Sequence, residues 1–203
     1  MERADGYVRG IFDAAPAHAR AFGFREKYAH TKRVVRWARR LLKTEKADAD
    51  VLLMAALFHD VGYTVSPEGH PARGAEICAA YLRENGYEEG FVARVADCVR
   101  RHDDKALLRD PTTPKELILL IEADCLDETG AMSVLRDALT EGACGGDYRR
   151  TYERLLQRSI FKRPGRFPCV TRTARRIWTD KQRLYFEIVK SLAKDLGETG
   201  EEP

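Results

Sequence analysis

The pattern of hydrophobic and polar positions along this chain is helical almost throughout. Apolar residues recur three and four positions apart, no stretch of any length alternates in the manner of a strand, and clusters of Gly, Pro and Asp interrupt the pattern at intervals. This pattern predicts an all-α, multi-helix bundle. Besides a central helix that begins near Val51, the expected helices cover residues 7–20, 25–44, 70–85, 88–102, 114–127, 131–141, 148–160 and 172–196.

The central helix is the element on which the predicted bundle depends. Eight consecutive apolar residues, from Val51 to Phe58, are followed by His59 and Asp60, and Gly62 then ends the segment. A helix that is apolar on every face must be buried in the middle of a bundle. The His–Asp pair at its end therefore points into whatever cleft lies there. Taken alone, this pattern is equally typical of a core helix with a polar end.

Length and composition restrict the class of protein. The 203 residues are typical of a single domain and allow a proper core. No apolar run approaches the roughly 20 residues that span a bilayer, and the first residues lack the apolar core of a signal peptide. We therefore expect a cytoplasmic protein with no membrane partner. Five cysteines without a CxxC pair argue against a disulfide framework or a zinc ribbon.

The charge of the chain is unevenly distributed. The net charge is only +3, but residues 149–183 contain twelve Lys and Arg against two acidic residues, a net charge of +10. The remainder has 23 basic and 30 acidic residues. Such asymmetry predicts an anionic partner near the basic segment, with nucleic acid as one candidate. A solvated basic helix face explains the same charge.

Imidazole and carboxylate groups occur at the ends of the predicted helices and on their inward faces. Four of the five histidines and two aspartates have such positions: His30, His59, His70, His102, Asp60 and Asp124. Asp124 lies on or near the buried face of a strongly apolar helix, where a carboxylate is unfavourable unless it is paired or bound to a metal. Nitrogen and oxygen ligands without thiolate favour Mn, Fe, Co, Ni or Zn, with Mg also compatible. One or two such divalent ions are the expected cofactor.

The order of these residues resembles that of the HD-domain metal-dependent phosphohydrolase superfamily, and in particular its single-domain hydrolases. The resemblance covers about residues 25–128 and rests on His30 and on the segments FHDVG, GHPARGAEI, RRHD and EADCLDETG. It implies a first metal ion that is bound by His30, His59, Asp60 and Asp124. It implies a second ion that is bound by His70 and His102 and bridged to the first by Asp60. Within one domain over 1–203, residues 129–196 are then a helical C-terminal extension and 197–203 a disordered tail.

The resemblance also implies hydrolysis of a phosphate ester or anhydride by a metal-activated water. The expected enzyme is a phosphomonoesterase, a phosphodiesterase or a nucleotide pyrophosphohydrolase, and its partner is a phosphorylated small molecule or a nucleotide. Arg33, Arg73 and Arg101 are the candidate substrate-binding residues, because they lie beside ligand histidines and can hold phosphate oxygens. Asp60 is the catalytic metal ligand. Asp103, which follows the last of the ligand histidines, is the candidate general acid.

Two other classes of function stay open at this point. An HD-type di-iron oxygenase uses a similar set of six ligands, and a redox-active iron centre would distinguish it. A non-catalytic nucleotide- or nucleic-acid-binding module is favoured by the basic segment 149–183, and steep salt dependence of binding without turnover would distinguish that class. The substrate, the native metal and the oligomeric state do not follow from the sequence.

Overall fold

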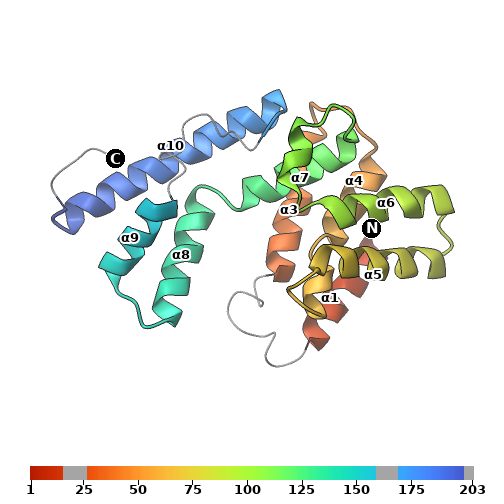
Figure 1. Ribbon diagram of the computed structural model, residues 1–203, viewed down its shortest axis with the longest axis horizontal. Coiled ribbons are helices and arrows are strands. Elements are labelled where there is room, and N and C mark those ends of the chain that lie inside the picture. The colour runs from red at the N-terminus through yellow and green to blue at the C-terminus, as the bar shows by residue number, and fades with distance from the viewer. Residues whose placement is uncertain (16–26, 159–168, 199–203) are drawn as a thin grey trace. The chain divides into compact units, whose positions relative to one another are not determined.

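The computed structural model describes residues 1–15, 27–158 and 169–198. Every regular element within these ranges is a helix, so the prediction of an all-α fold is confirmed. The chain forms two compact units, Met1–Asp127 and Glu128–Pro203 (Figure 1). The single domain expected from the sequence stays a prediction. None of the helices in the described ranges is both long and apolar enough to cross a membrane.

The described residues of the first unit form six α-helices and two short 3-10 helices. In chain order these are α1 (Glu2–Ala14), α3 (Lys27–Leu41), α4 (Ala49–Phe58), η2 (Val61–Thr64), α5 (His70–Glu84), α6 (Glu89–Arg101), η3 (Lys105–Arg109) and α7 (Lys115–Asp127). The helix predicted at 7–20 begins earlier than expected, and its last five predicted residues lie outside the described ranges.

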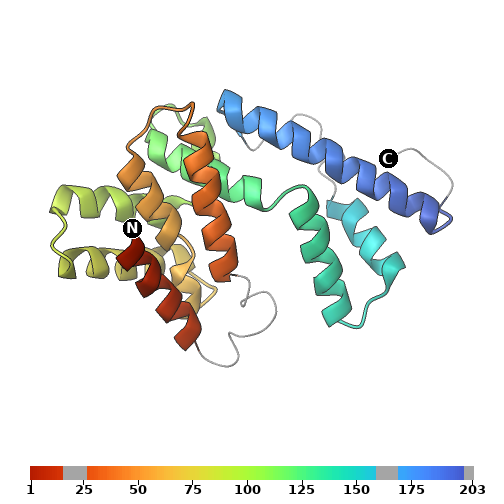
Figure 2. The ribbon, with the colours of Figure 1, turned by 180° about the vertical axis from the view of Figure 1, so that it is seen from behind.

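Helix α4 is the buried centre of the first unit. Seven of its ten residues are buried, and α1, α3, α5, α6 and α7 all contact it (Figures 1 and 2). The Asp48 carboxylate begins the helix because it accepts hydrogen bonds from the backbone N–H groups of Asp50 and Val51. The uninterrupted apolar run thus occupies the place that the sequence predicts for it.

The end of α4 lies at the His–Asp pair. The helix ends at Phe58 with His59 as its C-cap, as expected of a helix that ends in the His–Asp pair, and η2 follows almost at once. Gly62 allows η2 to pack closely against α5. A Cβ atom at this position would lie 2.0 Å from the carbonyl oxygen of His70 and 2.6 Å from the backbone nitrogen of Gly74. This contact holds the first turn of α5 next to the end of α4.

In its described residues, the second unit consists of three helices that contact one another, α8 (Ala131–Ala143), α9 (Tyr148–Arg158) and α10 (Arg172–Asp195). Their small core contains Leu155, Tyr185 and Val189, and the Tyr185 hydroxyl donates a hydrogen bond to the Leu155 carbonyl group. Most of the loop predicted at 161–171 and of the tail predicted at 197–203 lies outside the described residues.

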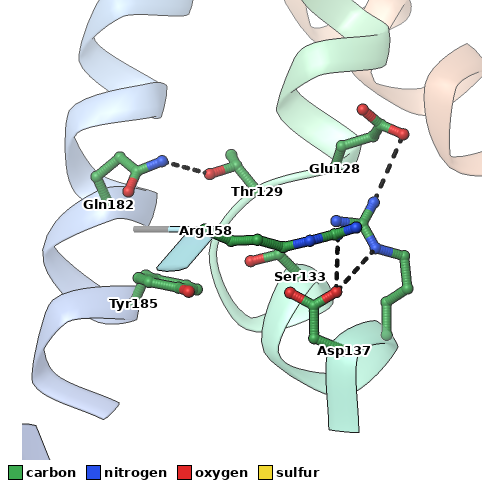
Figure 3. A pocket seen from close by; sticks show the side chains of 8 residues that line it. Glu128, Thr129, Ser133, Asp137, Arg158, Gln182 and Tyr185 are labelled. Carbon is green, nitrogen blue, oxygen red and sulfur yellow. Dashed lines mark hydrogen bonds and ion pairs between the residues drawn. The ribbon is translucent and has the colours of Figure 1, made fainter. Parts of the chain in front are cut away.

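A buried carboxylate joins α8 to α9 beside a cavity of about 180 Å³ (Figure 3). Asp137 is 1% exposed, and its Oδ1 atom accepts hydrogen bonds from Arg158 Nη1 at 2.9 Å and from Arg154 Nε at 3.4 Å. Glu141, one turn later on α8, pairs with Arg150 and Arg154. Charged side chains therefore hold these two helices together where the apolar core is small.

Ion pairs neutralise much of the positive charge that α9 contributes to the basic segment 149–183. Each of the four arginines of α9 pairs with an acidic residue of the same unit: Arg149, Arg150, Arg154 and Arg158. Their acidic partners lie outside residues 149–183, so the charge counted along the sequence exceeds the charge that α9 presents to a ligand. Binding of nucleic acid to this segment stays a prediction, and the pairing of the α9 arginines does not favour it.

Candidate metal centre

Six imidazole and carboxylate side chains converge within the first unit. They are His30 from α3, His59 and Asp60 from the end of α4, His70 from the start of α5, His102 from the end of α6 and Asp124 from α7. All but His30 belong to buried residues, and the His30 side chain is 12% exposed. The structure thus brings together every residue that the resemblance implies as a ligand.

Asp60 lies between two groups of imidazoles. Its Oδ2 atom is 3.6 Å from Nε2 of both His30 and His59, whereas its Oδ1 atom is 3.6 Å from Nε2 of His70 and 3.8 Å from Nε2 of His102. Ligand atoms about 2.1 Å from one ion lie about 3.0–3.4 Å apart. Each group therefore needs only a slight contraction to hold an ion. One carboxylate that faces two imidazole pairs is suited to bridge two ions.

Asp124 adds a second carboxylate to the first group. Its Oδ1 atom lies 3.2 Å from Nε2 of His30, and the Nε2 atoms of His30 and His59 are themselves 3.2 Å apart. This first group has four potential ligands, and the second has three if Asp60 is counted in both. At this separation a proton on one of the two nitrogens, or a metal ion that both bind, holds the rings together.

The other ring nitrogen of each histidine is bound to an acceptor, which fixes the tautomer of the ring. The acceptors are the carbonyl groups three residues earlier for His59, His70 and His102, at 2.7–3.2 Å, and the carboxylate of Asp127 for His30, at 2.8 Å. Carbonyl and carboxylate oxygens only accept, so each Nδ1 must donate. In its neutral form, each ring therefore presents the lone pair of Nε2 to the cluster, which is the form that binds a metal.

Helix ends explain how two of the rings acquire this orientation. His59 and His102 are the C-caps of α4 and α6. The last carbonyl groups of a helix have no partner within it, and the Nδ1–H group of the C-cap histidine satisfies one of them. The opposite nitrogen then points beyond the end of the helix. A histidine directly after an apolar helix is thus oriented by the backbone itself.

The electrostatics of the cluster favour a bound cation. Burial alone would lower the pKa of His30, but its hydrogen bonds with Asp124 and Asp127 raise that pKa to about 10. Burial would raise the pKa of Asp124, but the His30 hydrogen bond and the neighbouring imidazoles lower it to about 2. Burial lowers the pKa of His59 to about 4, so this ring stays neutral. At neutral pH the His30 ring is therefore protonated beside the ionised Asp124, whereas the His59 ring is neutral. A divalent ion bound by this group would take the place of the His30 Nε2 proton, and ionised carboxylates with neutral imidazoles are ligands that suit such an ion.

Two residues of the site were missed by the sequence analysis. The Lys27 ammonium donates a hydrogen bond to Asp60 Oδ2 at 2.8 Å. Asp127 accepts hydrogen bonds from Nδ1 of His30 at 2.8 Å and from Nε of Arg33 at 2.9 Å. A weak signal existed for each: Asp127 follows three residues after a buried aspartate of the same apolar helix, and Lys27 precedes His30 by one turn.

The predicted substrate-binding arginines lie in different surroundings. Arg33 is engaged by Asp127, Arg101 pairs with an aspartate of its own helix at 3.0 Å, and Arg73 is exposed in the first turn of α5. Asp103 is exposed directly after α6 and its C-cap. The role of the three arginines in substrate binding, and that of Asp103 as general acid, stay predictions.

Comparisons with known proteins agree with this geometry. The family model described as HD domain matches residues 28–129, about half of the chain. A predicted HD superfamily hydrolase from an uncultured Thermotogales bacterium is 26% identical, with a TM-score of 0.63 over 98% of this chain and 93% of that chain. An HD-superfamily hydrolase from Bacillus thuringiensis is 22% identical, with a TM-score of 0.71 over 97% and 96%. Bacillus subtilis YpgQ in complex with ADP is 20% identical, with a TM-score of 0.70 over 96% and 93%.

Among curated proteins, none matches the chain significantly. The two Bacillus structures are too distant in sequence to show more than the fold. The family model and the His/Asp cluster together support a metal-dependent hydrolase. Because the matched segment contains all six residues of the cluster, the chain belongs to the HD domain family.

Proposed function

We propose that this protein is a phosphohydrolase that cleaves a phosphate ester or anhydride bond in a small phosphorylated molecule or a nucleotide. The observation that carries the proposal is the position of the Asp60 carboxylate between two pairs of imidazole Nε2 atoms. Such nitrogen and oxygen ligands suit Mn, Fe, Co, Ni or Zn, with Mg also compatible. YpgQ, whose structure contains ADP, supports nucleotides as the first substrate class to test.

Two divalent ions held there would lower the pKa of a bound water, so that hydroxide is available to attack phosphorus at neutral pH. They would also place positive charge beside the phosphate oxygens. The protein residues fix the geometry: Asp60 faces both ligand groups, and Asp127 holds the His30 ring in its ligating orientation. His59 and His102 are buried, which keeps bulk solvent from their side of the cluster. In the reaction, a new P–O bond forms to water, the P–O bond to the leaving group breaks, and the leaving oxygen takes up a proton.

The proposal is tested by metal analysis combined with a phosphate-release screen. The metal-free protein is loaded with Mn²⁺, Co²⁺, Ni²⁺, Zn²⁺ or Mg²⁺ in turn and assayed with nucleoside phosphates, generic phosphomonoesters and phosphodiesters. We expect turnover that appears on metal loading and disappears on chelation. Turnover that requires iron and consumes oxygen would identify an oxygenase instead.

Asp60→Asn is the variant that tests the site itself. It preserves the shape of the side chain but removes the charge that both ligand groups face, so we expect metal stoichiometry and turnover to fall together while the helix content stays constant. Asp13→Asn on α1, where the carboxylate is 70% exposed, is the matched control. Full turnover by Asp60→Asn would exclude the mechanism.

A further inference from the structure

A lysine lies at the open side of the His/Asp cluster. Lys27 is the first residue of α3 and stands one turn before His30, so the two side chains share a face of the helix. Its Nζ atom is 2.8 Å from Asp60 Oδ2, the same oxygen that faces the imidazoles of the first ligand group. The ammonium group is therefore in direct contact with the ligand that joins the two groups.

An aromatic ring fixes the ammonium group from a second direction. Nζ of Lys27 lies 3.7 Å from the centroid of the Tyr63 ring, a cation–π contact. The same ring stacks on His70 with centroids 3.9 Å apart and an angle of 29° between the planes. Tyr63 thus links the lysine to the second ligand group. The position of the ammonium is consequently defined relative to both groups.

The exposure of Lys27 distinguishes it from the ligands. Its side chain is 23% exposed, compared with 1% for His59 and 5% for Asp60. An ammonium group has three N–H donors. Within residues 1–15, 27–158 and 169–198, Asp60 accepts from one of these donors and a second faces the Tyr63 ring. The third donor can contact a group that approaches from solvent. A lysine amine is ordinarily charged at neutral pH, so this donor has a positive charge to offer.

We propose that Lys27 is a substrate-binding residue whose ammonium contacts a non-bridging phosphate oxygen of a substrate held at the cluster. The inference rests on the proposed phosphohydrolase function. It assigns to α3 both a ligand histidine and a phosphate contact. Two of the three arginines expected from the sequence to hold phosphate pair with carboxylates, Arg33 with Asp127 and Arg101 with Asp97.

A purely structural role for Lys27 makes a different prediction. If the ammonium only neutralised Asp60, its removal would leave more negative charge at the cluster. Metal affinity would then rise or stay constant, and the KM for substrate would not change. If the ammonium contacts the substrate, KM rises while metal affinity does not fall. KM therefore separates the two roles, and metal affinity measured on the same variants shows whether the cluster is intact.

The test uses Lys27→Gln, Lys27→Arg and the control Lys32→Gln. Lys32 lies on the same helix, but its ammonium pairs with Asp5 outside the cluster. For Lys27→Gln, we expect Mn²⁺ affinity in calorimetry at or above the wild-type value and kcat/KM lower by about 10- to 100-fold, mainly through KM. Lys27→Arg should recover part of the loss, because it restores the charge, and Lys32→Gln should behave as the wild type.

Binding of inorganic phosphate to the Mn²⁺-loaded protein tests the inference independently of turnover. We expect Lys27→Gln to weaken phosphate binding and Lys32→Gln to leave it unchanged. Unaltered KM and unaltered phosphate affinity in Lys27→Gln would overturn the inference while leaving the hydrolase proposal intact. If the wild-type protein binds metal and phosphate but hydrolyses no substrate, the proposed function fails, and the phosphate affinities alone decide the role of Lys27.

Discussion

Asp127 makes a quantitative prediction possible, because it contacts the metal centre only through other residues. Its Oδ2 atom accepts from Nδ1 of His30 at 2.8 Å and from Nε of Arg33 at 3.1 Å, and its Oδ1 atom accepts from the same Nε at 2.9 Å. Both carboxylate oxygens therefore face donors. An asparagine has one oxygen and one NH₂ group at these positions, and the NH₂ group must face a donor in either orientation.

The Asp127→Asn variant consequently loses at least one of these contacts. If the amide oxygen faces His30, the amide nitrogen opposes Arg33; if the amide is reversed, the amide nitrogen opposes Nδ1 of His30 and the ring is no longer held in its ligating tautomer. Even where the amide oxygen faces His30, a neutral acceptor replaces a charged one, so the outer support of the ligand weakens in both orientations. Loss of such support lowers metal affinity by about 10- to 100-fold. This factor corresponds to about 1.4–2.7 kcal/mol of binding free energy.

Calorimetric titration of the metal-free protein with Mn²⁺ at constant pH measures this loss directly. Asp97→Asn is the matched control, because its carboxylate pairs with Arg101 on the surface of α6 and is 44% exposed. We expect wild-type Mn²⁺ affinity for the control and weaker affinity for Asp127→Asn, with the melting temperature of the metal-free proteins recorded in parallel. Wild-type affinity in Asp127→Asn would refute the view that this carboxylate orients the His30 ligand.

Three further predictions concern packing and charge. Gly62→Ala should lower the free energy of unfolding by about 3 kcal/mol, since its Cβ atom would lie 2.0 Å from a backbone oxygen. The control Gly10→Ala, whose Cβ atom would meet nothing within 4 Å, should leave the stability unchanged or raise it. Urea denaturation measures both. Asp137→Asn should cost about 1–3 kcal/mol of stability by weakening the α8–α9 ion pairs, and unchanged urea midpoints would contradict this. Burial raises the pKa of Tyr185 to about 12, above its ordinary value of 10.0. The folded state therefore keeps the phenol proton to a higher pH than the unfolded state, and the free energy of unfolding falls between about pH 10 and 12. Tyr185→Phe should reduce that fall in alkaline denaturation.

The all-helical fold and the central helix could be predicted from the sequence because the information is local. Apolar spacing identifies helices, and the unbroken run from Val51 to Phe58 requires burial on every side. The side-chain types of the cluster could be predicted for a related reason. A histidine directly after such a helix, as at His59, is oriented by the helix end whatever the rest of the chain does.

The tertiary structure alone decided which residues support the cluster and which do not. Lys27 meets Asp60 from 33 positions away, and Arg33 meets Asp127 from 94 positions away. Both contacts depend on how α3 packs against α4 and α7, a property to which no local pattern in either segment corresponds. The role of Gly62 also depends on tertiary packing. In the sequence a glycine here indicates the end of a segment, and only the approach of α5 shows that it is needed for a close packing contact.

The charge of the second unit shows the same division. Counting along the sequence gives the net charge of residues 149–183, but the partners of the α9 arginines lie on another helix and beyond the segment. Residue type and spacing therefore determined the helices and the metal-binding chemistry of this protein. The pairing of side chains was decided only by the packing of helices, because Coulombic and hydrogen-bond partners are set by distance in space and not by distance along the chain.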